Sequence, residues 1–300
     1  MAKLPKQYQF LDLSDYGRTA GHWIANQLKH TRFTPIHVTT LFIVAGLIAI
    51  GCMLNGHYKM AAFFIILKSI LDAADGELSR LKNTPSYTGR YYDSIADIIL
   101  NFCFLLAFWH ITDGSIVYML LAFFGIQLQG TVYNYYYVIL RNAVEGDSTS
   151  RIFEDAAPKA LKGESQRTVN ICYKIYDILY ITFDKTMYLM DKNASDSPPF
   201  PKWFMTLVSM YGLGFQLLFM AAMLAFKLEA YVIPFFIGSF FSRHGNNWSH
   251  NFHFDYDFGI DNLFGLIGFT SLVGIIGIIK VALIILAAIK ANKGEDYKYP

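Results

Sequence analysis

Long apolar runs constrain this chain more than any other feature of its sequence. About 20 apolar residues in a helix cross the roughly 30 Å hydrocarbon core of a bilayer, and in lipid the backbone must satisfy its own polar groups. Such runs, two of them shortened by polar residues at one end, lie at Val38–Leu54, Met60–Leu71, Ile95–Trp109, Ile116–Leu140, Phe204–Phe226 and Leu263–Ile289. The sequence therefore predicts an all-α, polytopic membrane protein with a six-helix transmembrane bundle.

The composition agrees with this prediction. Hydrophobic residues make up 54% of the 300 residues and charged residues only 16%, so the chain is more apolar than an ordinary soluble domain. The formal net charge of +2 does not indicate a nucleic-acid partner. The three cysteines lie far apart and form no CxxC pair, which argues against a zinc knuckle or a disulfide framework.

The distribution of Lys and Arg predicts the orientation. Five precede the first span, three lie between the second and third, nine lie within residues 141–202 and three follow residue 289, whereas the hairpin of residues 111–115 has none. Since basic loops stay in the cytosol, six spans with both termini inside fit this asymmetry. A seventh apolar stretch, Tyr231–Phe241, is short and contains Pro234, so we interpret it as re-entrant; seven spans would place the C-terminal tail outside.

These boundaries divide the chain into three parts. Residues 1–37 are expected to be a cytosolic N-terminal arm, 38–290 a single transmembrane domain with a cytosolic linker at 141–202, and 291–300 a cytosolic tail. Apolar residues recur at helical spacing from Tyr16 to Leu28, which predicts an amphipathic helix in the membrane interface; a helix packed on the protein is the alternative. Residues 168–190 resemble a helix but carry four charges, so we place them on the membrane surface.

Four carboxylates are expected to meet at one face of the membrane. Asp72 and Asp75 end the second apolar run, and Asp93 and Asp97 begin the third. Residues three or four apart lie on the same side of a helix, and an antiparallel hairpin would bring the two pairs together. Four like charges at this depth repel each other and are costly to desolvate unless cations neutralise them.

Divalent metal ions are the cations that this pattern favours. Hard oxygen ligands without neighbouring His or Cys suit Mg²⁺ or Mn²⁺, and two such ions would clamp a pyrophosphate. Gly76 and Gly89 allow close approach of a ligand to the backbone, and Arg80 offers a planar donor fork to a phosphate or a base.

The run from Asp72 to Asp97 resembles the CDP-alcohol phosphotransferase family, also called the class I CDP-alcohol phosphatidyltransferases. Its spacing is that of the family signature, D-x-x-D-G-x-x-A-R-x8-G-x3-D-x3-D, with Ser79 in place of the usual Ala. The phrase from Thr34 to Thr39 is also similar to the family's entry to the first span.

The resemblance implies a membrane enzyme with a six-helix fold, usually dimeric, and a site for two Mg²⁺ or Mn²⁺ ions. It makes Asp72, Asp75 and Asp93 metal ligands, and it places Asp97 in the same metal site as the base that deprotonates the acceptor hydroxyl. It also implies that the CDP part of the donor is held by Gly76, Ser79, Arg80 and Gly89.

The expected reaction transfers a substituted phosphate from a CDP-linked donor to an alcohol, with release of CMP, at a site facing the cytosol. We favour CDP-diacylglycerol as the donor, because the wording from Asp75 to Arg80 looks closer to prokaryotic phosphatidyltransferases. The alternative is a CDP-choline or CDP-ethanolamine transferase acting on diacylglycerol or ceramide. A divalent-cation transporter is a distant alternative, since it would not need Arg80 and two glycines at fixed offsets.

Three other features have more ordinary interpretations. Lys68, one turn before Asp72, is close enough in sequence to reach a substrate phosphate, but it can equally pair with Asp72 or extend to the interface, so it is left out of the site. The tyrosine cluster of residues 133–137 is expected to be an interfacial aromatic belt. The His- and Asp-rich segment 243–261 is expected to be an outer loop; if Tyr231–Phe241 crosses the membrane, lining the acceptor site is the alternative.

Overall fold

The computed structural model describes residues 4–144, 156–191, 194 and 199–241. Within these ranges the chain is helical and contains no strand, so the all-α prediction is confirmed there. The α-helices are α1 (Arg18–Leu28), α2 (Pro35–Leu54), α3 (Tyr58–Lys82), α4 (Tyr87–Thr112), α5 (Ile116–Ala143), α6 (Gln166–Met190), α7 (Lys202–Val208), α8 (Leu213–Ala225) and α9 (Val232–Phe241). Short 3-10 turns lie at Lys6–Tyr8, Ser209–Tyr211 and Glu229–Tyr231.

Three helices, α2, α4 and α5, are long and apolar enough to cross a membrane. The pair formed by α7 and α8 is a fourth candidate. Helix α3 continues without a break from the predicted second span into the charged segment that ends at Lys82. The predicted sixth span, Leu263–Ile289, and the segment 243–261 lie outside the described residues. The six-span count therefore stays a prediction, while an integral membrane protein with several apolar helices is supported.

The predicted span at Phe204–Phe226 is not one straight helix. Its two halves meet at an angle of 52° around the turn Ser209–Tyr211. The N-terminal segment packs at this break, where the backbone N–H of Gly214 donates to Ser14 Oγ at 3.0 Å. A side chain at Gly214 would overlap the backbone of Ser14. The bend thus makes room for a segment that lies about 200 residues earlier in the chain.

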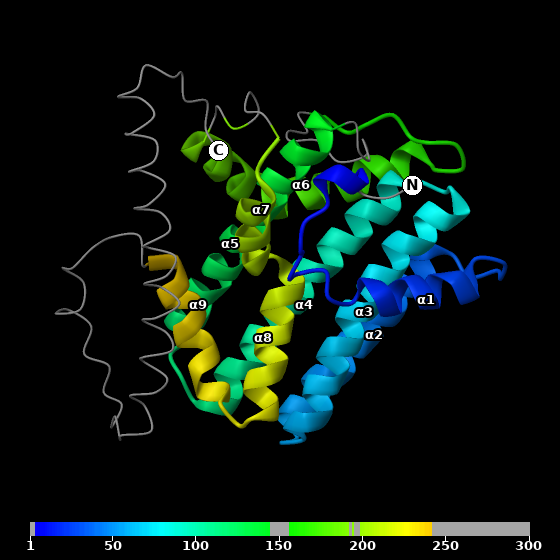
Figure 1. The fold of residues 1–300 in the computed structure, drawn as a ribbon. Helices are drawn as coiled ribbons and strands as arrows, with labels where there is room; N and C mark the ends of the chain where they lie inside the picture. The colour runs from blue at the N-terminus through cyan, green and yellow to red at the C-terminus, as the bar shows by residue number, and fades with distance from the viewer. Residues whose placement is uncertain (1–3, 145–155, 192–193, 195–198, 242–300) are drawn as a thin grey trace, which may run out of the picture.

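The hydrophobic core lies between α2, α3, α4, α5, α8 and α9. Figure 1 shows α2 beside α3, and α9 beside α5 at the other side of the bundle. Helix α2 also packs against α4, and α3 packs against α8. The largest fully buried apolar side chains of this core include Phe42, Phe104, Phe108, Met119 and Phe236.

Helix α1 lies across the second half of α3 (Figure 1). Gly21 makes this approach possible, because a Cβ there would lie 2.9 Å from the backbone nitrogen of Ala74. Ala25 is fully buried in the same contact, whereas Trp23 is 65% exposed on the outer side. The helix predicted within residues 16–28 is therefore present and packed on the protein, and its placement in the membrane interface stays a prediction.

Local sequence signals fix the ends of the helices that carry the acids. Thr34 and His37 form a reciprocal capping box at the start of α2, with Pro35 in the first turn. Helix α3 ends at Lys82, and its C-cap residue Asn83 has a left-handed φ of 51°. Ser86 then caps α4 by accepting a hydrogen bond from the Gly89 N–H. The chain thus reverses between Asp75 and Asp93 within one short turn.

Candidate functional site

Three of the four predicted carboxylates converge where α3 ends and α4 begins. Asp72, Asp75 and Asp93 each offer one oxygen, and these three oxygens all lie within 4.8 Å of one another. Asp75 and Asp72 come from adjacent turns of α3, and Asp93 comes from the second turn of α4. The spacing of the sequence thus brings together the acids from which a metal site would be built.

The hydrogen bonds around these acids leave unsatisfied acceptor capacity. Asp75 is only 7% exposed and accepts from Thr39 Oγ1 of α2 at 2.6 Å. Asp93 Oδ1 is buried and has no hydrogen-bond partner. A buried carboxylate oxygen without a donor is costly, and a cation relieves that cost. The three side chains therefore fit a hard divalent ion such as Mg²⁺ or Mn²⁺.

The fourth predicted carboxylate, Asp97, has a different neighbour. Its Oδ1 accepts a short hydrogen bond from Lys68 Nζ, which also donates to Asp72 Oδ2 at 3.0 Å. Lys68 is fully buried, and its ammonium lies 4.6 Å from the centre of the Phe42 ring. Sequence reasoning left Lys68 out of the site. Its signal was a lysine inside an apolar run, one helical turn before Asp72.

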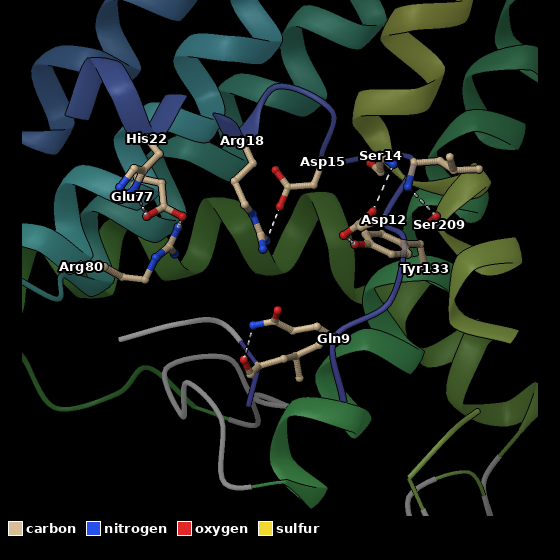
Figure 2. A network of polar contacts seen from close by, with 12 residues as sticks. Gln9, Asp12, Ser14, Asp15, Arg18, His22, Glu77, Arg80, Tyr133 and Ser209 are labelled. Carbon is tan, nitrogen blue, oxygen red and sulfur yellow. Dashed lines mark hydrogen bonds and ion pairs between the residues drawn. The ribbon is translucent and has the colours of Figure 1, made fainter. Parts of the chain in front are cut away.

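The predicted nucleotide-contact residues lie around the same turn. Arg80 extends over Gly76 and donates to Glu77 Oε1 at 2.8 Å, and Glu77 Oε2 lies 3.4 Å from His22 Nδ1 of α1 (Figure 2). Ser79 Oγ donates to the backbone carbonyl of Thr84 at 3.0 Å. The family position occupied here by Ser79 therefore has a structural role in the turn that alanine could not supply.

Sequence reasoning missed Glu164, which lies in the linker. Its carboxylate accepts from Ser86 Oγ at 2.8 Å and from the backbone N–H groups of Thr88 at 2.7 Å and Tyr87 at 3.2 Å. Partial burial acts to raise the pKa of Glu164, but the hydrogen bonds from Thr88 and Ser86 outweigh it and lower the pKa. No motif marks Glu164, because the contact joins the linker to a helix about 75 residues earlier.

Helix α6, which follows Glu164, packs against α4 and α5. The Tyr180 hydroxyl donates to the backbone carbonyl of Ser94 at 2.7 Å, between Asp93 and Asp97 in the sequence. Tyr176 stacks on Tyr180, with 4.7 Å between the ring centres. The segment predicted to lie on the membrane surface therefore forms one wall around the start of α4, and its depth relative to the membrane stays a prediction.

Comparison with known proteins supports the family resemblance. The model of the CDP-alcohol phosphatidyltransferase family matches residues 25–152, which include α2 to α5 and all four aspartates. No curated protein matches the chain at a significant level. The family consists of transferases of substituted phosphate groups and generally uses divalent metal ions, in agreement with the acidic cluster. The match over residues 25–152 supports the assignment of the protein to the CDP-alcohol phosphatidyltransferase family, which is a family of transferases.

Proposed function

We propose that this protein transfers a phosphatidyl group from CDP-diacylglycerol to the hydroxyl of a small polar alcohol and releases CMP. The observation that carries the proposal is the convergence of Asp72, Asp75 and Asp93, with one buried oxygen of Asp93 lacking a partner. This arrangement suits a divalent ion that binds a pyrophosphate. When bound, such an ion neutralises charge on the pyrophosphate and on the departing CMP.

The chain's own residues divide the remaining work. Arg80 and the backbone near Gly76 and Gly89 hold the CDP part, where a planar guanidinium suits the phosphate or the base. The acceptor oxygen forms a bond to the β-phosphorus while the bond from that phosphorus to CMP breaks, and CMP leaves with the electron pair. The hydroxyl proton moves to Asp97, whose Oδ1 is held by Lys68 and whose Oδ2 is assigned to the proton.

Charge and topology support a site that faces the cytosol. The basic segments around Arg80 and in the linker belong on the cytosolic side, and soluble nucleotide products would leave there. The N-terminal arm, the transmembrane catalytic domain and the C-terminal tail keep the boundaries given above as part of the proposal. We also propose that the protein forms the homodimer that the family resemblance implies.

A CMP-release assay tests the donor. Full-length protein in lipid nanodiscs with Mg²⁺ is offered CDP-diacylglycerol, CDP-choline or CDP-ethanolamine, each with matched alcohol acceptors. Of the three donors, we expect only CDP-diacylglycerol to give CMP and a phospholipid product. CMP from CDP-choline with diacylglycerol would overturn the donor assignment in favour of the second family branch. No CMP with any donor, together with Mn²⁺ flux into proteoliposomes, would establish the transporter alternative.

A further inference from the structure

We propose that the ammonium group of Lys68 takes the place of a second divalent ion, so that this site holds one ion, on Asp72, Asp75 and Asp93. The inference rests on the proposed metal-dependent function, and it departs from the two ions that the family resemblance implies. It concerns the number of cations at the site and the identity of one of them.

The geometry separates the four acids into two environments. Asp72, Asp75 and Asp93 have oxygens within 4.8 Å of one another, and Asp97 is not part of that group. The cation that Asp97 contacts is the Lys68 ammonium, which bridges it to Asp72. In two-metal sites the ions lie about 3.5–4 Å apart and are held by ligands on both sides. In this protein the Lys68 ammonium occupies the position between Asp72 and Asp97 where a second ion would bind.

The Lys68 ammonium is held in this position by burial and by two ion pairs. Its side chain is fully buried, and two of its three possible donor directions are directed at Asp72 and Asp97. The adjacent surface is the ring of Phe42, 4.6 Å from the ammonium. A buried ammonium is stable only when paired, because its desolvation is otherwise uncompensated.

Charge makes the ammonium and a second ion mutually exclusive. A divalent ion held by Asp72 and Asp97 would lie at contact distance from Lys68 Nζ, where like charges repel strongly in a medium of low dielectric constant. The four carboxylates carry a formal charge of minus four, and the Lys68 ammonium and one divalent ion together carry plus three. The net formal charge of the site is then minus one. A second divalent ion would make the net charge of the substrate-free site positive before any phosphate binds.

This arrangement also assigns Lys68 a positioning role. The hydrogen bond from Lys68 Nζ to Asp97 Oδ1 fixes the carboxylate that would accept the proton. In a site with two ions, that orientation would depend on metal concentration. Metal dependence of turnover in this protein should therefore reflect a single binding event.

Counting ions in the absence of substrate tests the proposal. Full-length protein in nanodiscs is titrated with Mn²⁺, bound metal is measured by equilibrium dialysis, and electron paramagnetic resonance reports whether two Mn²⁺ ions are coupled. We expect about one site-bound Mn²⁺ per wild-type chain and no coupling. Lys68→Gln, which removes the ammonium, should bind about two ions and show the coupled spectrum of a metal pair. Asp75→Asn in the wild-type background should lose the single ion.

Two controls use the same helix. Lys68→Arg keeps the positive charge and should keep one ion, and Lys59→Gln removes a charge from the exposed, opposite end of α3 and should also keep one. Two coupled ions in the wild type would overturn the proposal, as would one ion in a folded Lys68→Gln variant. If Lys68→Gln does not fold, the wild-type and Lys68→Arg counts decide, because two ions in either contradicts it. Ion counting is independent of CMP release, so a chain with one ion and no transfer would refute only the proposed function.

Discussion

Two groups of acids in the molecule differ in how their oxygens are satisfied. In the strap, defined here as residues 9–17, Asp12 accepts from the Tyr133 hydroxyl at 2.6 Å and from the Ser14 N–H at 3.1 Å (Figure 2). Asp15 pairs with Arg18. In the acidic cluster of Asp72, Asp75 and Asp93, a buried oxygen of Asp93 has no partner, and the three carboxylates lie close together.

This difference distinguishes acids that stabilise the fold from acids whose stabilisation requires a bound ligand. Each strap acid has donors from within the protein, so removing one leaves a local defect in packing. Asp72, Asp75 and Asp93 repel one another, and one buried oxygen of Asp93 has no donor, so we expect a bound cation to stabilise this group. Hydrogen-bond satisfaction, more than exposure, thus indicates which acids are functional.

The largest expected effect belongs to Asp97, the proposed base. Asp97→Asn keeps the size of the side chain but removes the base, which should lower CMP release by about 10²- to 10⁴-fold. Binding of Mn²⁺ and of the CDP-donor should stay near wild type, because these depend on the other acids and on Arg80. Rapid-quench turnover and donor-binding measurements check this. Recovery of turnover at high metal concentration would show instead that Asp97 is chiefly a metal ligand.

Asp93→Asn should act on metal affinity. Since the variant loses a direct ligand, Mn²⁺ affinity should fall by at least the roughly 10- to 100-fold that loss of an outer partner costs. The matched strap variant, Asp12→Asn, should leave Mn²⁺ affinity unchanged. Isothermal titration of both variants makes the comparison, and an equal loss in the two would contradict the division between structural and functional acids.

Tyr133→Phe should weaken the strap. The change leaves one oxygen of Asp12 short of a donor, so the free energy of unfolding should fall by about 1–3 kcal/mol. Thermal unfolding in detergent measures the loss as a lower midpoint. Turnover per folded molecule should remain close to wild type. A selective loss of turnover without a change in midpoint would place the strap in the catalytic machinery.

The smallest effect is expected at Glu164, and it depends on pH. Hydrogen bonds to Glu164 lower its pKa in the folded protein, so its stabilising contribution is present above the ordinary value of 4.5 and disappears as the pH falls through the lowered pKa. Glu164→Gln should therefore lower the unfolding midpoint at neutral pH and approach wild type in acid. Midpoints measured across pH test this, and a constant difference at every pH would contradict a role for the carboxylate charge.

Some interpretations of the sequence needed the structure to correct them. The tyrosines of residues 133–137 were expected to form an interfacial belt, but Tyr135 and Tyr137 are buried, and Tyr133, Tyr135 and Tyr136 donate to Asp12 or Asp191. The belt prediction is wrong because the strap and the segment around Asp191 cover this face. Periodicity within one helix cannot show which distant segment will lie on it.

The sequence by itself determined the helical class of the described residues and the group of acids. Apolar length, capping residues and spacings of three or four act within a few turns of one helix, so they can be interpreted locally. Asp72, Asp75 and Asp93 meet because one short turn reverses the chain between them.

Only the tertiary structure decided the contacts between distant segments. The bend around the turn Ser209–Tyr211, the contact of Glu164 with the start of α4 and the burial of Lys68 between Asp72 and Asp97 each depend on where another helix or loop packs. A lysine one turn before an aspartate has the same local pattern whether its ammonium reaches water or a second carboxylate. The packing of α3 with its neighbours removes water from Lys68, and this desolvation is what makes its charge part of the site.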